Sequence, residues 1–179
     1  MNRYSYVLNS VNEAIQNQSI KTVGLFPFNA LIDPANTDIF NGKIDFLQSA
    51  LEALKILADK NYSVILFINQ FKSRALSFEQ FNNLNKFLEE FINSHGVKVN
   101  GIYWCPSTAK SDPYVTPNPG MFHKATENQK IDWKDVEVIS SSDHDLVAAE
   151  KVKAKPIKIG NGSKWTHFDT LYEWARSVN

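Results

Sequence analysis

Side chains suited to acid–base chemistry or polar ligand binding follow two of the runs that read as strands. Asn69 comes directly after a continuous apolar run at 63–68, Ser141 follows a second run at 136–139, and Asp145 lies four residues further on. In open parallel α/β sheets the ligand lies beyond the carboxyl ends of the strands. We therefore expect these three side chains to approach one another. A carboxylate there can accept a proton or ligate a cation, while the amide and the hydroxyl can hold a polar ligand.

A short acidic run also suggests a metal site. Asp143, His144 and Asp145 are consecutive and follow three serines. Ligands so close in sequence seldom converge on one ion without help from elsewhere, and the chain has no second cluster of this kind. We expect instead that Ser142 caps a helix whose acidic first turn complements the helix dipole.

Hydrophobic periodicity predicts the elements that position these residues. Continuous apolar runs bracketed by polar residues are typical of buried strands, and apolar residues three and four apart indicate helices. Their alternation implies a parallel sheet covered on both faces. Strands are expected at 22–26, 63–68, 97–105, 136–139 and 156–159, and helices at 46–57, 77–95, 119–125, 143–152 and 166–178. Ser77 and Thr166 are the expected N-caps of two of these helices.

The chain opens with a predicted amphipathic helix. Its apolar stripe consists of Tyr4, Val7, Leu8, Val11, Ala14 and Ile15. We treat residues 1–20 as a helical extension and residues 21–179 as one domain. The extension either covers a flank of the sheet or forms an interaction surface, and the sequence leaves both possibilities open.

The composition excludes several function classes. The 19 basic and 19 acidic residues balance, so no overall field favours a nucleic acid or an anionic membrane. The longest apolar runs are far too short to span a bilayer. The N-terminus lacks the features of a signal peptide. A single cysteine excludes an internal disulfide, and a cytoplasmic location is expected.

Two segments carry a family resemblance. Asn-Gly-Ile-Tyr-Trp-Cys-Pro at 100–106 and Thr-Pro-Asn-Pro-Gly-Met at 116–121, with Ile-Asn-Gln at 68–70 upstream, resemble one branch of the haloacid dehalogenase (HAD) superfamily. That branch comprises phosphatases acting on D,D-heptose 1,7-bisphosphate or histidinol phosphate. The resemblance runs from about residue 23 to residue 162. It implies a three-layer, Rossmann-like α/β fold with a parallel sheet of about five strands and helices on both faces.

The resemblance places phenylalanine at both essential positions of the first motif. In the family this motif is a strand followed by Asp, any residue, Asp and Gly. The first Asp is the nucleophile, the second is the general acid and base, and magnesium lies between carboxylates. This chain has Phe26 and Phe28 there. A phenylalanine cannot attack phosphorus, relay a proton or ligate a cation.

The other three motifs are also degenerate. Ile68 replaces the phosphate-binding hydroxyl of the second motif, although Asn69 agrees with the subfamily. Thr116 replaces the lysine of the third motif. In the fourth motif Ser141 replaces a magnesium-binding Asp, and Asp145 alone keeps its carboxylate.

Many members of the branch also hold a structural zinc ion after the third strand. Of the expected ligands only Cys105 remains, because Ser107, Asp112 and Tyr114 fall at the other positions. A lone thiolate cannot replace four-coordinate zinc. We therefore expect neither a bound metal nor another cofactor.

These substitutions predict a pseudophosphatase with no catalytic residue, acting by binding a protein partner or a sugar-phosphate ligand. Loss of a nucleophile has cost about 10⁶ in rate elsewhere, and loss of one oxyanion donor about 10²–10³. Phe26 and Phe28 either plug the former pocket or line an apolar one.

The alternative is a magnesium-dependent sugar-phosphate phosphatase that uses non-standard residues, with a substrate like D,D-heptose 1,7-bisphosphate. Asp33 is its candidate nucleophile if the first motif is shifted along the chain. The competing interpretation of Asp33 is a turn residue before Pro34.

Overall fold

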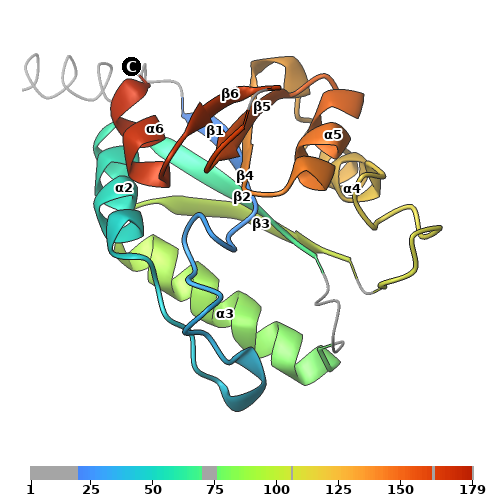
Figure 1. Cartoon of the computed structure of the whole chain (residues 1–179), viewed down its shortest axis with the longest axis horizontal. Coiled ribbons are helices and arrows are strands. Elements are labelled where there is room, and N and C mark those ends of the chain that lie inside the picture. The colour runs from blue at the N-terminus through green and yellow to red at the C-terminus, as the bar shows by residue number, and fades with distance from the viewer. Residues whose placement is uncertain (1–19, 70–75, 106, 163, 179) are drawn as a thin grey trace, which may run out of the picture.

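Six parallel strands form one sheet in the computed structural model, which describes residues 20–69, 76–105, 107–162 and 164–178. The strand order is β3-β2-β1-β4-β5-β6, with β1 in the middle between β2 and β4 (Figure 1). The predicted N-terminal helix and Gln70 lie outside the described residues. The strands are β1 (Lys21–Leu25), β2 (Tyr62–Ile68), β3 (Lys98–Trp104), β4 (Glu137–Ser140), β5 (Lys155–Ile159) and β6 (Thr166–Phe168).

Helices cover both faces of the sheet, as the alternating pattern predicts. One face is covered by α2, α3 and α6, and the other by α4 and α5 (Figure 1). The fold is therefore the expected three-layer α/β arrangement. The helices are α2 (Gln48–Asp59), α3 (Phe78–Ser94), α4 (Gly120–Gln129), α5 (Asp143–Lys151) and α6 (Leu171–Ser177), with 3₁₀ turns η1 (Ile39–Asn41) and η2 (Trp133–Asp135). None of the described helices is long and apolar enough to cross a bilayer.

Helix α3 begins where its sequence predicts. Ser77 Oγ accepts the Gln80 N–H at 3.1 Å, and Gln80 Oε1 accepts the Ser77 N–H at 3.0 Å. This reciprocal capping box satisfies two amide groups that the helix itself leaves unpaired. The expected cap at Ser77 is confirmed.

The end of the chain differs from the prediction. Thr166 does not cap a helix but begins β6, which pairs in parallel with β5 and makes six strands rather than five. Thr170 is the N-cap of α6, and its side chain accepts the Glu173 N–H at 3.3 Å. Three residues are too few for a period-two pattern to show in the sequence, so the strand was missed and the helix was placed too early.

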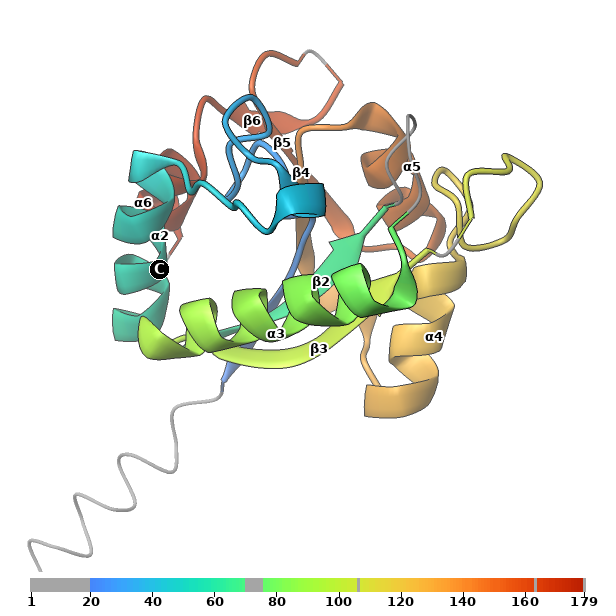
Figure 2. The ribbon, with the colours of Figure 1, turned by 90° about the horizontal axis from the view of Figure 1, so that it is seen from below.

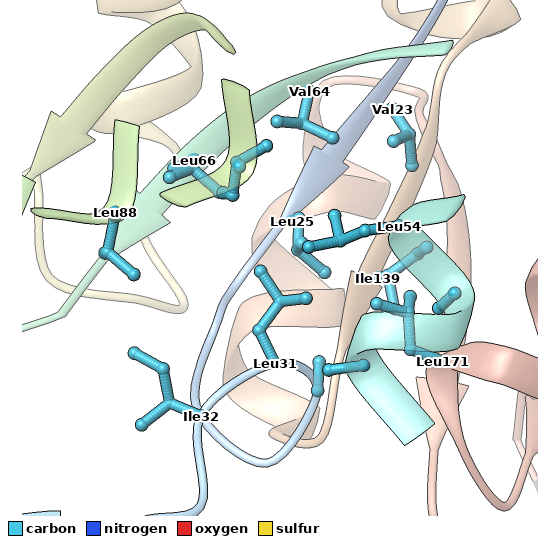
Figure 3. Close-up of a cluster of buried hydrophobic side chains, with 14 of the residues drawn as sticks. Val23, Leu25, Leu31, Ile32, Leu54, Val64, Leu66, Leu88, Ile139 and Leu171 are labelled. Carbon is cyan, nitrogen blue, oxygen red and sulfur yellow. The ribbon is translucent and has the colours of Figure 1, made fainter. Parts of the chain in front are cut away.

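Two apolar clusters lie on the two faces of the sheet. The larger lies under α2, α3 and α6, and Figure 3 shows its side chains from β1, β2, β4 and these helices. The smaller lies under α4 and α5 and is rich in aromatic rings. Phe67 is at its centre, with ring centroids 4.4 Å from Phe122 and 5.4 Å from Phe26.

Candidate functional site

Asp145 accepts hydrogen bonds from three segments at the carboxyl edge of the sheet. The Asn69 amide, just beyond β2, donates to Oδ1 at 2.8 Å, and the Thr116 hydroxyl donates to the same atom at 2.7 Å. The Ser140 hydroxyl, at the end of β4, donates to Oδ2 at 2.7 Å. We call these four residues the Asp145 cluster. The structure therefore brings Asn69 and Asp145 into contact, as expected, and adds Thr116 and Ser140 to them. The Ser141 hydroxyl, which was expected to join Asn69 and Asp145, makes its hydrogen bonds elsewhere.

Burial controls the ionisation of this carboxyl group. Asp145 is only 3% exposed. Burial raises its pKa above the ordinary value, and the hydrogen bonds from Ser140, Thr116 and Asn69 together with the nearby His144 partly offset the rise. The cluster is thus a hydrogen-bonded carboxyl group held in a poorly solvated position.

A cleft opens beside the Asp145 cluster. Its volume is about 610 Å³, within the range of small-molecule sites. One wall is the loop between β3 and α4, which extends outward next to α4 and α5 (Figure 2, yellow). Lys151 Nζ ties this loop to α5 by donating to the Pro117 carbonyl at 2.7 Å. Eight of its ten lining residues are polar: Asn69, Ser107, Thr108, Lys110, Thr116, Ser142, His144 and Asp145. The other two are Val115 and Pro117.

Ser141 belongs to a separate group of contacts. Its hydroxyl donates to the Phe28 carbonyl at 3.3 Å and accepts from the Asn29 amide at 3.2 Å. Lys158 lies on the other side, and its Nζ donates to the Ser141 carbonyl at 2.7 Å and to Asp143 Oδ1 at 2.6 Å. The position that the resemblance aligns with a magnesium-binding Asp is thus tied into the protein's own hydrogen bonds.

The two motif phenylalanines point to different parts of the core. Phe26 is 4% exposed and stacks in the smaller cluster with Phe67. Phe28 is partly buried against the larger cluster. Neither side chain lines the cleft beside Asp145. Ile68 is likewise buried, 2% exposed, in the larger cluster.

Asp33 lies in a turn, away from the Asp145 cleft. After Phe28 the chain folds back, with Asn29 at a φ of 62° and the Pro27 carbonyl accepting from the three amides at 30–32. Asp33 Oδ1 then accepts the Ala35 N–H at 2.9 Å, and Oδ2 accepts from the Asn36 amide at 2.7 Å. These bonds lower the Asp33 pKa, the Asn36 side chain contributing most. The carboxylate therefore has the geometry of an Asx turn.

The run Asp143-His144-Asp145 does not converge on one point. Asp143 is paired with Lys158, whereas Asp145 turns into its own cluster. Ser142 is at the N-cap position of α5 as predicted, but its side chain makes no capping hydrogen bond. Its N–H instead donates to Ser140 Oγ at 3.0 Å. Asp143 and Asp145, the two acids in the first turn of α5, complement the positive end of the helix dipole.

The residues at the motif positions do not fit magnesium. Phe26 and Phe28 offer no side-chain oxygen, and the Ser141 hydroxyl is hydrogen-bonded within the protein. Within the described ranges no three His, Cys, Asp or Glu side chains lie close enough to hold a metal ion.

The loop that the resemblance aligns with the family's zinc site is held by its own hydrogen bonds. Cys105 Sγ donates to the Ser107 carbonyl at 3.3 Å, and Asp112 Oδ1 accepts the Tyr114 N–H at 2.8 Å. Burial raises the pKa of the Cys105 thiol, which disfavours the thiolate that zinc requires.

Sequence reasoning missed the two lysines at this edge. Lys110 lines the cleft, so the lysine missing from position 116 does not leave the cleft without a cation. Lys158 lies on β5 and reaches Ser141. The only sign in the sequence that Lys158 reaches this edge is its place after Ile157, near the end of a predicted strand. Nothing in the sequence indicated that Lys110 lines the cleft.

Comparisons with known proteins agree with this architecture. No family model matches the chain. A D-glycero-beta-D-manno-heptose-1,7-bisphosphate 7-phosphatase of Haemophilus ducreyi is 29% identical over 120 residues, which cover 62% of this chain and 66% of that protein. The corresponding Vibrio cholerae protein is 28% identical over 115 residues, covering 59% and 62%. The bifunctional histidine biosynthesis protein HisB of Buchnera aphidicola is 26% identical over 140 residues, 75% of this chain and 39% of that protein.

Solved structures decide the fold. The D,D-heptose 1,7-bisphosphate phosphatase of B. bronchiseptica, complexed with magnesium and phosphate, superposes with a TM-score of 0.73 at 19% identity, covering 87% of this chain and 96% of that one. The chain has the HAD-like fold. The corresponding phosphatase of Burkholderia thailandensis superposes with a TM-score of 0.64 at 17% identity, over 87% and 96%. The chain thus resembles heptose bisphosphate phosphatases in sequence, although it spans just under two thirds of the length of the first curated relatives.

These comparisons support one of the two expected functions, the phosphatase, more than the other, the pseudophosphatase. The curated relatives are heptose bisphosphate phosphatases and HisB, and none of them is described as inactive. They therefore favour the alternative, a HAD-type sugar-phosphate phosphatase, over the pseudophosphatase. Loss of catalysis rests on the residues of this chain alone.

Proposed function

We propose that this chain is a non-catalytic HAD-like protein that binds a polar small molecule in the cleft beside Asp145. One observation carries the proposal. Both carboxylate positions of the first motif are phenylalanines, and Phe26 is packed in the core rather than facing a ligand. Neither candidate carboxylate takes the nucleophile's place, because Asp33 is held in a turn and Asp145 is buried among three hydrogen-bond donors.

The lining of the cleft supports a ligand rich in hydroxyl groups. Asn69, Thr108, Thr116 and Ser142 supply amide and hydroxyl groups that both donate and accept. Lys110 and His144 are exposed, whereas Asp145 lies at the buried side. One exposed lysine neutralises a phosphate dianion only in part. We therefore expect a sugar to bind at least as well as its phosphate ester.

The experiment is isothermal calorimetry with a sugar phosphate and the matching free sugar, each with and without magnesium. D,D-heptose 1,7-bisphosphate and its dephosphorylated sugar form a suitable pair. The proposal predicts binding of the free sugar that does not depend on magnesium and weakens about tenfold in Thr116→Val, which corresponds to one hydrogen bond of roughly 1.4 kcal/mol. Thr166→Val, the same substitution at the opposite edge of the sheet, serves as the control. Failure of the free sugar to bind the wild-type protein contradicts the proposal.

The second candidate function is a magnesium-dependent phosphatase, and the relatives support it. It requires a magnesium site and a nucleophile from residues outside the family's positions. In the same titrations it predicts binding of the sugar phosphate that strengthens with magnesium and is followed by phosphate release. Magnesium-dependent binding of the phosphate alone therefore favours this candidate.

A further inference from the structure

A second concavity, remote from the Asp145 cleft, lies at the edge where the strands begin. It has a volume of about 1060 Å³ and extends along the sheet from Asn100 on β3 to Thr166 on β6. We call it the amino-edge groove. Partly exposed apolar side chains, Tyr62, Ile131 and Val178, line it together with charged residues. A surface of this kind suits an amphipathic partner rather than a small polar ligand.

The N-terminal segment joins the sheet at this groove. Ile20 lines the groove and is 57% exposed, and β1 starts at the next residue. Nineteen residues precede Ile20. A connection of residues 16–20 spans at most about 17 Å even when fully extended. The predicted helix at 4–15 is therefore held close to the groove by chain connectivity alone.

The chemistry of residues 1–19 matches an occupant of the groove. Apart from Met1 and Tyr6, their apolar residues fall on one helical stripe, and Arg3 and Glu13 are their only charged side chains. A helix of 12 residues is marginal in water without tertiary packing, so its stripe needs a surface to cover. Such a helix is about 18 Å long, and the edge of six strands is about 24 Å wide, so the lengths are compatible.

The charges of the groove do not oppose this occupant. Its lining holds three lysines and three acids: Lys21, Lys130, Lys155, Asp132, Asp135 and Glu137. The segment likewise carries one charge of each sign. The positive and negative charges of the groove balance, so burial of apolar surface is the main contribution to the free energy of docking. Each fully buried Val or Leu contributes roughly 1.5–3 kcal/mol relative to exposure.

We propose that residues 4–15 dock as an amphipathic helix in the amino-edge groove of the same molecule, with the stripe around Val11 against Tyr62, Ile131 and Val178. This proposal is independent of the function proposed for the cleft, because the groove and the cleft lie at opposite edges of the sheet.

Hydroxyl-radical footprinting of the full chain, read by mass spectrometry, tests the contact. The test variant is Val11→Asp, at the centre of the stripe. The matched control is Asn9→Asp, which adds the same charge on the opposite face of the predicted helix. The proposal expects labelling of Tyr62, Ile131 and Val178 to rise several-fold in Val11→Asp and to stay at the wild-type level in Asn9→Asp. Equal labelling in all three proteins overturns it.

A second variant reports from the groove side. Ile131→Asp, a partly exposed position, is expected to raise the labelling of Tyr4 and Leu8 without unfolding the sheet. Unchanged labelling there overturns the proposal even if Val11→Asp fails to fold. Light scattering at the footprinting concentration must show a monomer. Protection that disappears on dilution of a dimer assigns the groove to a second copy and overturns docking within one molecule.

Discussion

The Thr116 hydroxyl donates to Asp145 Oδ1 at 2.7 Å, which joins the loop after β3 to the first turn of α5. The resemblance aligns Thr116 with a lysine of the family and Asp145 with a carboxylate. The hydroxyl gives the buried carboxyl group a hydrogen-bond donor, so the carboxyl group needs no cation at this position. This relationship accounts for how the carboxyl edge remains stable without the charges that resemblance to a phosphatase predicts.

The pH dependence of stability tests the environment of Asp145. Burial raises the pKa of Asp145 in the folded state above its ordinary value. The folded protein therefore keeps this proton in a range where the unfolded chain has lost it. The contribution of Asp145 to the free energy of unfolding is expected to fall as pH rises from about 4 through the raised pKa, by at most about 1.4 kcal/mol per pH unit.

Asp145→Asn should remove this pH-dependent contribution to the free energy of unfolding. Urea unfolding at a series of pH values from 4 to 8 measures it, and the wild-type curve should fall relative to the variant as pH rises. Asp135→Asn, which removes an exposed carboxylate on η2, is the control for the loss of a negative charge. Parallel curves for the wild type and Asp145→Asn would show that burial does not raise this pKa.

Restoring an acid at the first motif should damage the fold. Phe26 lies among Phe67 and Phe122, with centroids 5.4 Å and 6.2 Å away. Phe26→Asp is expected to cost at least about 3–5 kcal/mol, the range for truncating a buried phenylalanine, because a carboxylate adds a desolvation penalty. Phe26→Leu serves as the apolar control and should cost clearly less. Equal losses in chemical denaturation would place Phe26 outside the core.

The thiol of Cys105 is expected to be inert in the folded protein. It is 1% exposed, and burial raises its pKa. The thiolate is the reactive form, so both effects slow alkylation and disulfide exchange. Titration with an aromatic disulfide at pH 8 should detect no thiol in native protein and one after denaturation. Stoichiometric reaction within minutes in the native state would contradict the buried position.

Gly120 is expected to tolerate no side chain. A Cβ there would lie 2.4 Å from the Pro113 carbonyl oxygen and 2.8 Å from its carbon, both backbone atoms. Gly120→Ala should therefore displace the loop that carries Thr116 and destabilise the protein by about 1–3 kcal/mol, as overpacking does. Thermal unfolding measures the loss, and ligand binding in the cleft should weaken as well. An unchanged melting temperature would mean that the loop adjusts freely.

Strong local patterns made most of the fold predictable. The continuous apolar run at 63–68 predicted a buried strand and Ser77 predicted the start of a helix, and both are observed. The contact between Asn69 and Asp145 was also predictable, because the carboxyl ends of parallel strands lie at one edge of the sheet.

The predictions that failed concern three-dimensional geometry, which local sequence patterns do not contain. β6 has three residues, and only its pairing with β5 shows that it is a strand. Phe26 and Phe28 were expected either to plug a pocket or to line an apolar one; their side chains pack against different clusters, and neither lines the cleft beside Asp145. The places of Lys110 and Lys158 depend on how the loop and β5 approach the site, which one sequence does not reveal.

Phosphate release from D,D-heptose 1,7-bisphosphate and from an aryl phosphate, with magnesium in excess, tests the central claim most directly. The comparison includes the wild type, Asp33→Asn and Asp145→Asn. We expect all three to match the control without protein, because phenylalanine stands at both positions that the resemblance aligns with catalytic carboxylates. Turnover by the wild type that is lost in either variant would contradict this account and identify the chain as a phosphatase with a relocated carboxylate.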